Sequence, residues 1–315
     1  MNRRTFSKNA LGAIIATASL GASARAAESA SQKPFNCKFA PNIYKWTNLC
    51  PNLTSGMSDA DKIKWWYDQG FRAMEDNDML KYPAEKQEIC TKTREKLGMQ
   101  FGVFTSSIGG KYWLTACKSG EKAAPDRKAA IERIKKEAAA TVEAAKRFNA
   151  TWTTVVPGYA DHTLEHSFQM ANVVEQLKYA AEICEKAGVV MVLEPLSFQP
   201  HPLHWLRKTS DAYMICKAVN SPSCKILFDV YHQQNTEGSL IRNIDDAFDE
   251  IAYFHLGDCP LRTEPLSGEI NYKNLIAHIH GKGYRGLYGM EHRQSDKTLE
   301  GDKRLLQIYR EIDVA

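Results

Sequence analysis

The sequence of 315 residues lacks the features that mark several classes of protein. Its eight cysteines include no C-x-x-C pair, and no two of them have the spacing of a zinc finger. No linker rich in proline, glycine or serine divides the body of the chain. With 43% hydrophobic and 25% charged residues, the composition is that of a globular protein and excludes collagen-like, low-complexity and wholly disordered chains.

A charge excess of one sign is also absent from most of the chain. Of the 41 basic residues, four lie within residues 1–26, which carry no acidic residue. The other 37 basic residues are matched by 37 acidic ones, so the formal charge of +4 belongs to the first segment alone. A neutral body gives no electrostatic support for a nucleic-acid or membrane partner, and we expect no nucleic-acid partner.

Residues 1–26 are predicted to be an export signal rather than part of the fold. The segment N-R-R-T-F-S-K at 2–8 precedes an apolar run at 10–22, which is too short to span a bilayer as a stable helix. The apolar run is followed by A-R-A at 24–26, which is the pattern of a signal-peptidase cleavage site. The earlier motif R-R-x-F-x-K resembles a twin-arginine signal. We expect a periplasmic protein with no stable membrane span after processing. An ordinary secretory signal and an uncleaved anchor are the alternatives.

An oxidising compartment permits disulfides, and Cys216 and Cys224 are close enough in sequence to be a candidate pair. The alternative is that most of the eight cysteines are small buried hydrophobic residues.

From residue 36 onward, short apolar runs alternate with helical patterns, and eight runs are predicted to be strands. They lie at 37–44, 71–75, 100–105, 151–157, 189–196, 224–231, 251–256 and 286–291. Apolar residues at three- and four-residue spacing predict helices at 129–148 and 164–187. Start signals at Ser58 and Thr209 and stop signals at four glycines support this pattern: Gly70, Gly98, Gly188 and Gly283.

Eight such repeats predict a single-domain (β/α)8 TIM barrel over residues 36–313. An open doubly wound sheet is the alternative. The longest irregular stretch, 106–126, is expected to be a loop over a strand end.

A polar residue closes each of four consecutive apolar runs: Glu194, Asp229, His255 and Glu291. Their spacings of 35, 26 and 36 residues each match about one βα unit, so they should converge at the carboxyl ends of neighbouring strands. Three carboxylates meeting there would repel one another unless a divalent cation bound them. Mixed oxygen and nitrogen ligands suit Mn²⁺, Mg²⁺, Co²⁺ or Zn²⁺. Taken singly, each residue could instead be a turn or helix-cap residue.

Other polar residues near the predicted strand ends are candidates either for substrate contact or for ion pairs. They are Glu75, His201, His204, His232, Asp258, Arg262, Glu264 and Glu269. Of these, Arg262 suits a carboxylate or hydroxyl group of a substrate.

The second half of the chain carries a set of specific motifs. They are L-E-P at 193–195, F-D-V-Y-H-Q-Q at 228–234, D-C-P-L-R-T-E-P at 258–265, G-E-I-N-Y at 268–272 and G-M-E at 289–291. On these motifs the chain resembles the xylose isomerase-like superfamily of sugar isomerases and epimerases, and within it the hydroxypyruvate isomerases. The likeness covers residues 189–292 well and continues weakly through 39–42 and 70–75.

The resemblance implies a (β/α)8 fold and one divalent metal ion at Glu194, Asp229, His255 and Glu291. It also implies that Glu194 and Glu291 transfer the proton, while His232 and Arg262 bind substrate oxygens. Glu75 and Glu269 are further candidates for substrate binding. Hydroxypyruvate isomerases tend to have glutamine where His255 stands, whereas ketose epimerases of the superfamily have histidine.

We therefore expect a metal-dependent isomerase that interconverts a hydroxy-ketone and a hydroxy-aldehyde through an enediolate. Its partner would be a small hydroxy-carbonyl compound or sugar, and a homo-oligomer is left open. The alternatives are an epimerase, lyase or hydrolase acting on a free or 3-keto sugar, a non-catalytic periplasmic sugar-binding protein, and a metal-dependent nuclease on the same scaffold.

Overall fold

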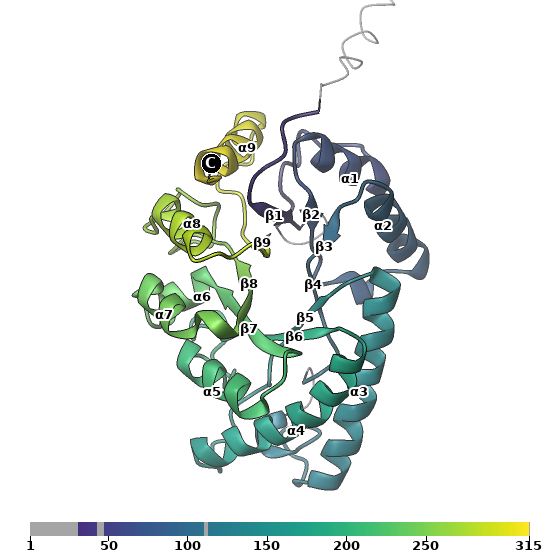
Figure 1. The fold of residues 1–315 in the computed structure, drawn as a ribbon, viewed down its shortest axis with the longest axis vertical. Helices are drawn as coiled ribbons and strands as arrows, with labels where there is room; N and C mark the ends of the chain where they lie inside the picture. The colour runs from purple at the N-terminus through teal and green to yellow at the C-terminus, as the bar shows by residue number, and fades with distance from the viewer. Residues whose placement is uncertain (1–30, 43–46, 110–112, 315) are drawn as a thin grey trace, which may run out of the picture. The chain divides into compact units, whose positions relative to one another are not determined.

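Parallel strands form the centre of the structure, and helices surround them (Figure 1). The computed structural model describes residues 31–42, 47–109 and 113–314, so the predicted export signal lies outside the described residues. The strands are β1 (Lys38–Pro41), β2 (Ala73–Met74), β3 (Gln100–Phe101), β4 (Val103–Thr105), β5 (Trp152–Val155), β6 (Val190–Leu193), β7 (Cys224–Asp229), β8 (Ile251–His255) and β9 (Leu287–Met290).

The strands follow one another around a ring. Seven form a parallel sheet in the order β1-β9-β8-β7-β6-β5-β4, and β2 pairs with β3. A parallel bridge between Asn42 and Glu75 links the ends of β1 and β2, and β3 leads into β4 through Gly102. The predicted (β/α)8 barrel is confirmed, with its third strand divided at Gly102.

The helices are α1 (Asp59–Asp68), α2 (Ala84–Lys96), α3 (Arg127–Phe148), α4 (His166–Lys186), α5 (Thr209–Val219), α6 (Val230–Thr236), α7 (Leu240–Ala247), α8 (Tyr272–Gly281) and α9 (Leu299–Ile312). Short 3-10 turns lie at Met79–Lys81, Leu114–Ala116 and Phe248–Glu250. The Ser58 side chain accepts a hydrogen bond from the Asp61 amide, as an N-cap should. All four glycines predicted to stop helices have positive φ.

The interior of the ring is filled by one inward-facing residue from each of seven strands, with Trp152 of β5 packed against them. They are Ala40, Ala73, Val103, Val192, Leu227, Tyr253 and Leu287. Because side chains of a strand alternate between its faces, the next inward position lies two residues further along. That position holds Glu75 after Ala73, Glu194 after Val192 and His255 after Tyr253. The polar residues therefore form the next layer of the barrel interior, directly above the apolar layer, which we call the apolar floor.

The pairing of β7 with β8 is irregular between Ile226 and Leu227. Ile226 pairs with Ile251, but Leu227 pairs with Tyr253, so β8 has one extra residue at this point. Beyond it the register brings Asp229 opposite His255.

Two expectations need correction or refinement. All eight cysteines lie within the described residues as buried thiols that form no disulfide, so the candidate Cys216–Cys224 pair is not joined. Both residues belong to the packed core between helix α5 and strand β7, where they serve as small apolar side chains.

The expected loop 106–126 contains the turn Leu114–Ala116 and a bridge between Trp113 and Lys118. Within the described part of the chain, no helix is long and apolar enough to cross a membrane.

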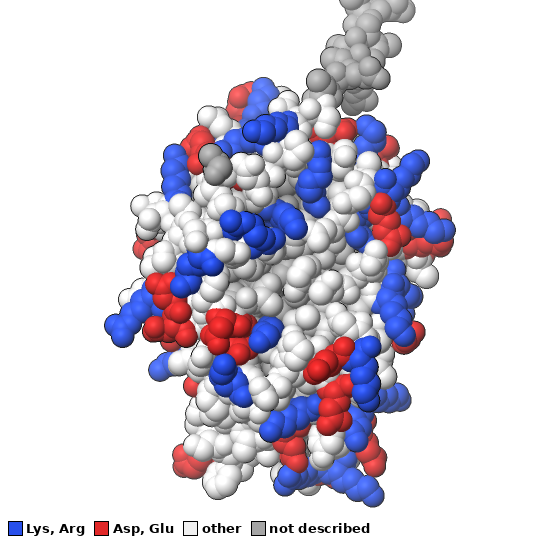
Figure 2. Space-filling model, viewed as in Figure 1, with Lys and Arg blue, Asp and Glu red and all other residues white. Residues whose placement is uncertain are grey.

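Charged side chains of both signs are interspersed over the face shown in Figure 2. The middle of this face is mostly uncharged, while Lys, Arg, Asp and Glu gather toward its edge.

Candidate active site

The four residues that close β6, β7, β8 and β9 meet above the apolar floor. One ligand atom from each of Glu194, Asp229, His255 and Glu291 lies within 4.8 Å of the others, and all four side chains are buried. The His255 Nδ1 atom is 2.8 Å from Glu291 Oε2 and 3.5 Å from Glu194 Oε1. The structure thus brings together the four residues that the sequence placed on consecutive strands.

The electrostatics of this cluster fit a divalent cation. Burial, together with the charges of Glu291 and Asp229, raises the pKa of Glu194 to about 7. Burial lowers the pKa of His255, but Glu291 and Glu75 raise it well above its ordinary value. His255 Nδ1 is turned toward the carboxylates of Glu291 and Glu194. Three carboxylates and an imidazole nitrogen that converge in this way are a donor set that Mn²⁺, Mg²⁺, Co²⁺ and Zn²⁺ accept.

Glu75 lies on the far side of the His255 ring. Its Oε2 atom is 3.4 Å from His255 Nε2 and accepts a hydrogen bond of 2.7 Å from the Tyr253 hydroxyl. Glu75 is fully buried and is not among the described residues that line the cavity above the cluster. The structure therefore favours the ion-pair interpretation of Glu75 over direct substrate contact.

Two glycines make room for this arrangement. A Cβ atom on Gly289 would lie 2.1 Å from Glu75 Oε2 and 2.5 Å from His255 Cδ2. A Cβ atom on Gly102 would lie 2.1 Å from the Tyr253 hydroxyl oxygen. No real side chain fits at such distances, so glycine at both positions is needed to seat Glu75, Tyr253 and His255.

A cavity of about 540 Å³ opens onto the cluster. Its described lining residues are Asn77, Thr105, Thr154, Val156, Glu194, Leu196, Pro200, His201, His204, Tyr231, His232, Leu261, Arg262, Glu291 and Arg293. A volume of this size is typical of small-molecule sites.

Arg262 and His232 stand at the edge of the cluster, on the side of β7 and β8. One guanidinium nitrogen of Arg262 lies 2.9 Å from both Asp229 Oδ2 and Glu291 Oε2, and the guanidinium sits over the Tyr231 ring. Burial lowers the pKa of His232 to about 3, so its ring is neutral. Its Nδ1 atom lies 2.9 Å from Ser197 Oγ.

The other candidate residues divide into two that line the cavity and two that stabilise a loop. His201 and His204 line the cavity. The Asp258 carboxylate accepts hydrogen bonds from the backbone amides of its own loop, and Glu264 accepts hydrogen bonds from Ser295. These two acids therefore hold the loop that carries Arg262.

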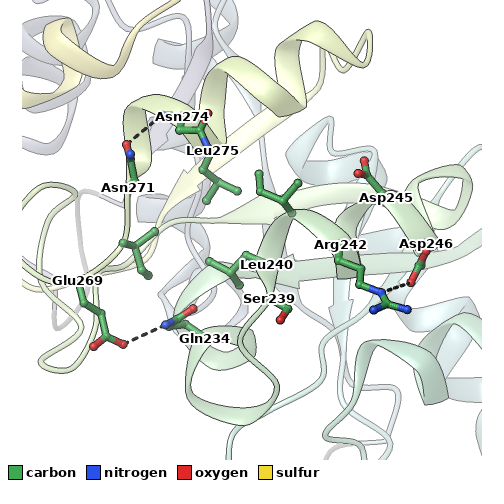
Figure 3. A pocket seen from close by; sticks show the side chains of 12 residues that line it. Gln234, Ser239, Leu240, Arg242, Asp245, Asp246, Glu269, Asn271, Asn274 and Leu275 are labelled. Atoms are coloured by element: carbon green, nitrogen blue, oxygen red, sulfur yellow. Dashed lines mark hydrogen bonds and ion pairs between the residues drawn. The ribbon is translucent and has the colours of Figure 1, made fainter.

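Glu269 does not lie in the cavity with the cluster. It is exposed and accepts a hydrogen bond of 3.0 Å from Gln234 Nε2 (Figure 3). Both residues line a separate groove of about 580 Å³ formed by α6, α7 and α8. The predicted contact between Glu269 and substrate would require a different position of this side chain.

Sequence reasoning missed the polar residues from the first half of the barrel, Asn77, Thr105 and Thr154. Thr105 ends β4, Thr154 is the last residue but one of β5, and Asn77 lies three residues beyond β2. The rule that located the cluster, a polar residue where a strand ends, would have found Thr105 if neutral side chains had been counted.

The comparisons with known proteins agree with this architecture. A family model described as "Xylose isomerase-like TIM barrel" matches residues 63–311. The 2-oxo-tetronate isomerase of Pectobacterium atrosepticum is 27% identical over 264 residues, which cover 84% of this chain and 95% of that protein. The hydroxypyruvate isomerase of Escherichia coli is 34% identical over 140 residues, which cover 44% of this chain and 54% of that protein.

Among solved structures, an AP endonuclease of family 2 from Brucella melitensis has a TM-score of 0.69 at 21% identity, covering 84% of this chain and 96% of that one. At that identity the likeness concerns the fold.

Proposed function

The chain belongs to the xylose isomerase-like TIM barrel family, and from that premise we propose that it is a metal-dependent aldose–ketose isomerase. The reaction would interconvert a hydroxy-ketone and a hydroxy-aldehyde. Relatives named 2-oxo-tetronate isomerase and hydroxypyruvate isomerase support this class of reaction. The observation that carries the proposal is the buried convergence of Glu194 and Glu291 around His255 and Asp229 at the mouth of the barrel.

The four buried side chains would hold one divalent cation, which would stabilise the negative charge that develops on the substrate. Asp229 and His255 would act mainly as ligands. Glu194 and Glu291 would also exchange protons with the substrate: one would take the proton from the carbon beside the carbonyl, and the other would return a proton to the neighbouring carbon.

The remaining side chains bind and orient the substrate oxygens. The Arg262 guanidinium supplies fixed donors beside Glu291, where negative charge develops. The neutral His232 ring is held by Ser197, and its Nε2 atom has no hydrogen-bond partner among the described residues. That nitrogen is available to a substrate hydroxyl or carbonyl oxygen.

The test is proton NMR of the metal-loaded mature protein in D₂O with hydroxypyruvate, common ketoses and aldoses, and 3-keto sugars. Deuterium should enter a carbon next to a carbonyl only when metal is present, and Glu194→Gln and Glu291→Gln should each abolish the exchange. Full exchange in both variants would refute the two-carboxylate mechanism. Tight metal binding without exchange for any compound would instead favour a sugar-binding protein.

Epimerisation of a ketose is a second candidate. It uses the same proton removal, and His255 stands where ketose epimerases of the resembling superfamily have histidine. The same NMR experiment separates the two, because an epimerase returns the proton to the carbon from which it came.

We also propose that residues 1–26 direct the protein to the periplasm and are then removed. Mass spectrometry of the mature protein should find an N-terminus at Ala27, and replacing Arg3 and Arg4 by lysine should stop export if the route is the twin-arginine one.

A further inference from the structure

We infer that the amino-terminal end of the barrel docks on a phospholipid surface with anionic headgroups. The residues that make this contact are Lys33, Lys38, Arg72, Arg285 and Arg310, which we call the basic patch. The inference goes beyond the reaction proposed above and rests on the proposed export of the chain.

The basic patch lies where the strands of one part of the barrel begin. Lys38 is the first residue of β1, Arg72 directly precedes β2, and Arg285 lies two residues before β9. Figure 2 shows Lys and Arg side chains gathered over the place where β1 and β9 lie in Figure 1. The metal-binding cluster stands at the opposite, carboxyl end of the strands, so docking through the patch leaves the mouth of the barrel open.

Contacts join the members of the patch into one surface. Arg310 Nη1, in the last turn of α9, donates a hydrogen bond of 2.7 Å to the Lys33 backbone oxygen. Burial and the like charge of Arg72 lower the pKa of Arg310, so these two guanidinium groups are neighbours. Burial raises the pKa of the Cys37 thiol to about 11, and the charge of Arg285 opposes this rise, which places Arg285 beside the start of β1.

Neighbouring acids do not balance this positive charge. Within the described residues, none of the five side chains has an ion-pair partner, and the three arginines donate hydrogen bonds only to backbone oxygens. Asp313 lies among them, and its carboxylate accepts hydrogen bonds from two backbone amides that precede β1. Asp68, at the end of α1, is paired with Lys64. The patch therefore keeps a clear excess of positive charge even when Asp313 is counted.

The route of the chain indicates what the patch faces. The backbone amides of Gln32 and Phe35 donate hydrogen bonds to the carboxyl end of α1 and the turn after it, so this segment runs beside the patch. The predicted export signal ends at residue 26, five residues before Ser31, and five residues span at most about 18 Å. While the signal is held in a membrane, the basic patch is therefore held close to the headgroups of that membrane.

Electrostatic attraction to such a surface is local and depends on salt. Beyond residue 26 the chain as a whole is neutral, so only the patch, and not the net charge, favours an anionic surface. The attraction falls off within the Debye length, which is about 8 Å at physiological ionic strength. Each lysine or arginine at an anionic bilayer strengthens binding by about fivefold, which corresponds to about 1 kcal/mol.

The experiment is sedimentation of the mature protein with vesicles of phosphatidylglycerol and phosphatidylcholine in equal parts, and with vesicles of phosphatidylcholine alone. The wild type should sediment with the anionic vesicles only, and raising NaCl from about 0.05 M to about 0.5 M should release it. Lys33→Gln with Lys38→Gln should weaken binding about 25-fold. Neither lysine side chain forms a hydrogen bond or ion pair in the described part of the chain, so the fold should be unaffected.

Lys128→Gln with Lys136→Gln is the matched control. Both lysines are exposed on α3, outside the patch, and their loss changes the net charge by the same amount. This variant should bind the anionic vesicles as the wild type does. Equal weakening in the two double variants would overturn the inference, because net charge alone would then explain the attraction.

Failure of the wild type to bind anionic vesicles would also overturn the inference. If soluble polyglutamate bound the protein while the vesicles did not, the partner of the patch would be an acidic protein surface instead. Since the measurement requires neither export nor turnover, its result is independent of the proposed reaction.

Discussion

Replacing Gly289 by alanine tests whether Glu75 and His255 must keep their places for a cation to bind. The added methyl group would lie 2.1 Å from Glu75 Oε2 and 2.5 Å from His255 Cδ2, and both side chains are fully buried. Neither distance is compatible with contact between unbonded atoms. Either the carboxylate or the imidazole ring must therefore move.

Two effects of known size follow from this displacement. Overpacking a well-filled interior costs about 1–3 kcal/mol of the free energy of unfolding. Disturbing a carboxylate that orients a ligating histidine reduces metal affinity by about 10–100-fold. We expect Gly289→Ala to show both: a lower melting temperature without metal, and weaker binding of Mn²⁺ or Mg²⁺ by calorimetric titration.

Gly281→Ala is the matched control. Gly281 ends helix α8, and a Cβ atom there would meet nothing within 4 Å. Cation affinity should equal that of the wild type, and stability should be unchanged or slightly higher. If Gly289→Ala bound the cation as tightly as Gly281→Ala, the assignment of His255 as a ligand held by Glu75 would be refuted.

Three further outcomes are expected. Glu75→Gln should weaken cation binding by about 10–100-fold while leaving KM for substrate near its wild-type value; the opposite pattern would make Glu75 a substrate contact. Because the folded-state pKa of Glu194 is raised to about 7 and that of His255 is also raised, both groups favour the folded state more at low pH. Urea unfolding of the metal-free protein should therefore show that the stability difference between the wild type and Glu194→Gln shifts against the wild type as pH rises from about 4.5 through 7; a difference that does not change with pH would contradict the assignment. Thiol titration of the full chain should find eight reactive groups after unfolding and few before it, whereas six would show that Cys216 and Cys224 are joined.

The strands and the four-residue cluster could be predicted from sequence for one physical reason. Strands buried on both faces give nearly continuous apolar runs, and the first polar residue after each run stands at the mouth of the barrel. The predicted strands were too long where hydrophobic residues continue into the loop or helix that follows the strand. Leu196 and Tyr231, for example, lie beyond the ends of β6 and β7 but line the cavity, so their apolar character serves the site.

The residues around the cluster could not be placed in this way. Glu75 occupies the same kind of position as Glu194, yet it faces the back of the His255 ring because Gly289 leaves space there. Glu269 lies in a specific motif, but its loop carries it to the outer groove beside Gln234. The positions of these two side chains depend on the space that neighbouring residues leave in the folded structure. The spacing of residues along the sequence does not predict that space.

The irregular pairing of β7 with β8 limits how this barrel can change through insertions and deletions. Strand β8 supplies a floor residue, Tyr253, and a cluster residue, His255, and both lie beyond the extra residue between Ile251 and Tyr253. Loss of that extra residue, Ala252, would restore regular alternation and leave Tyr253 opposite Leu227 and His255 opposite Asp229. Loss of Phe254 would instead turn His255 to the other face of the strand, toward the helices, since side chains alternate. Lineages that keep the chemistry should therefore tolerate a change in the length of β8 at Ala252 but not between Tyr253 and His255.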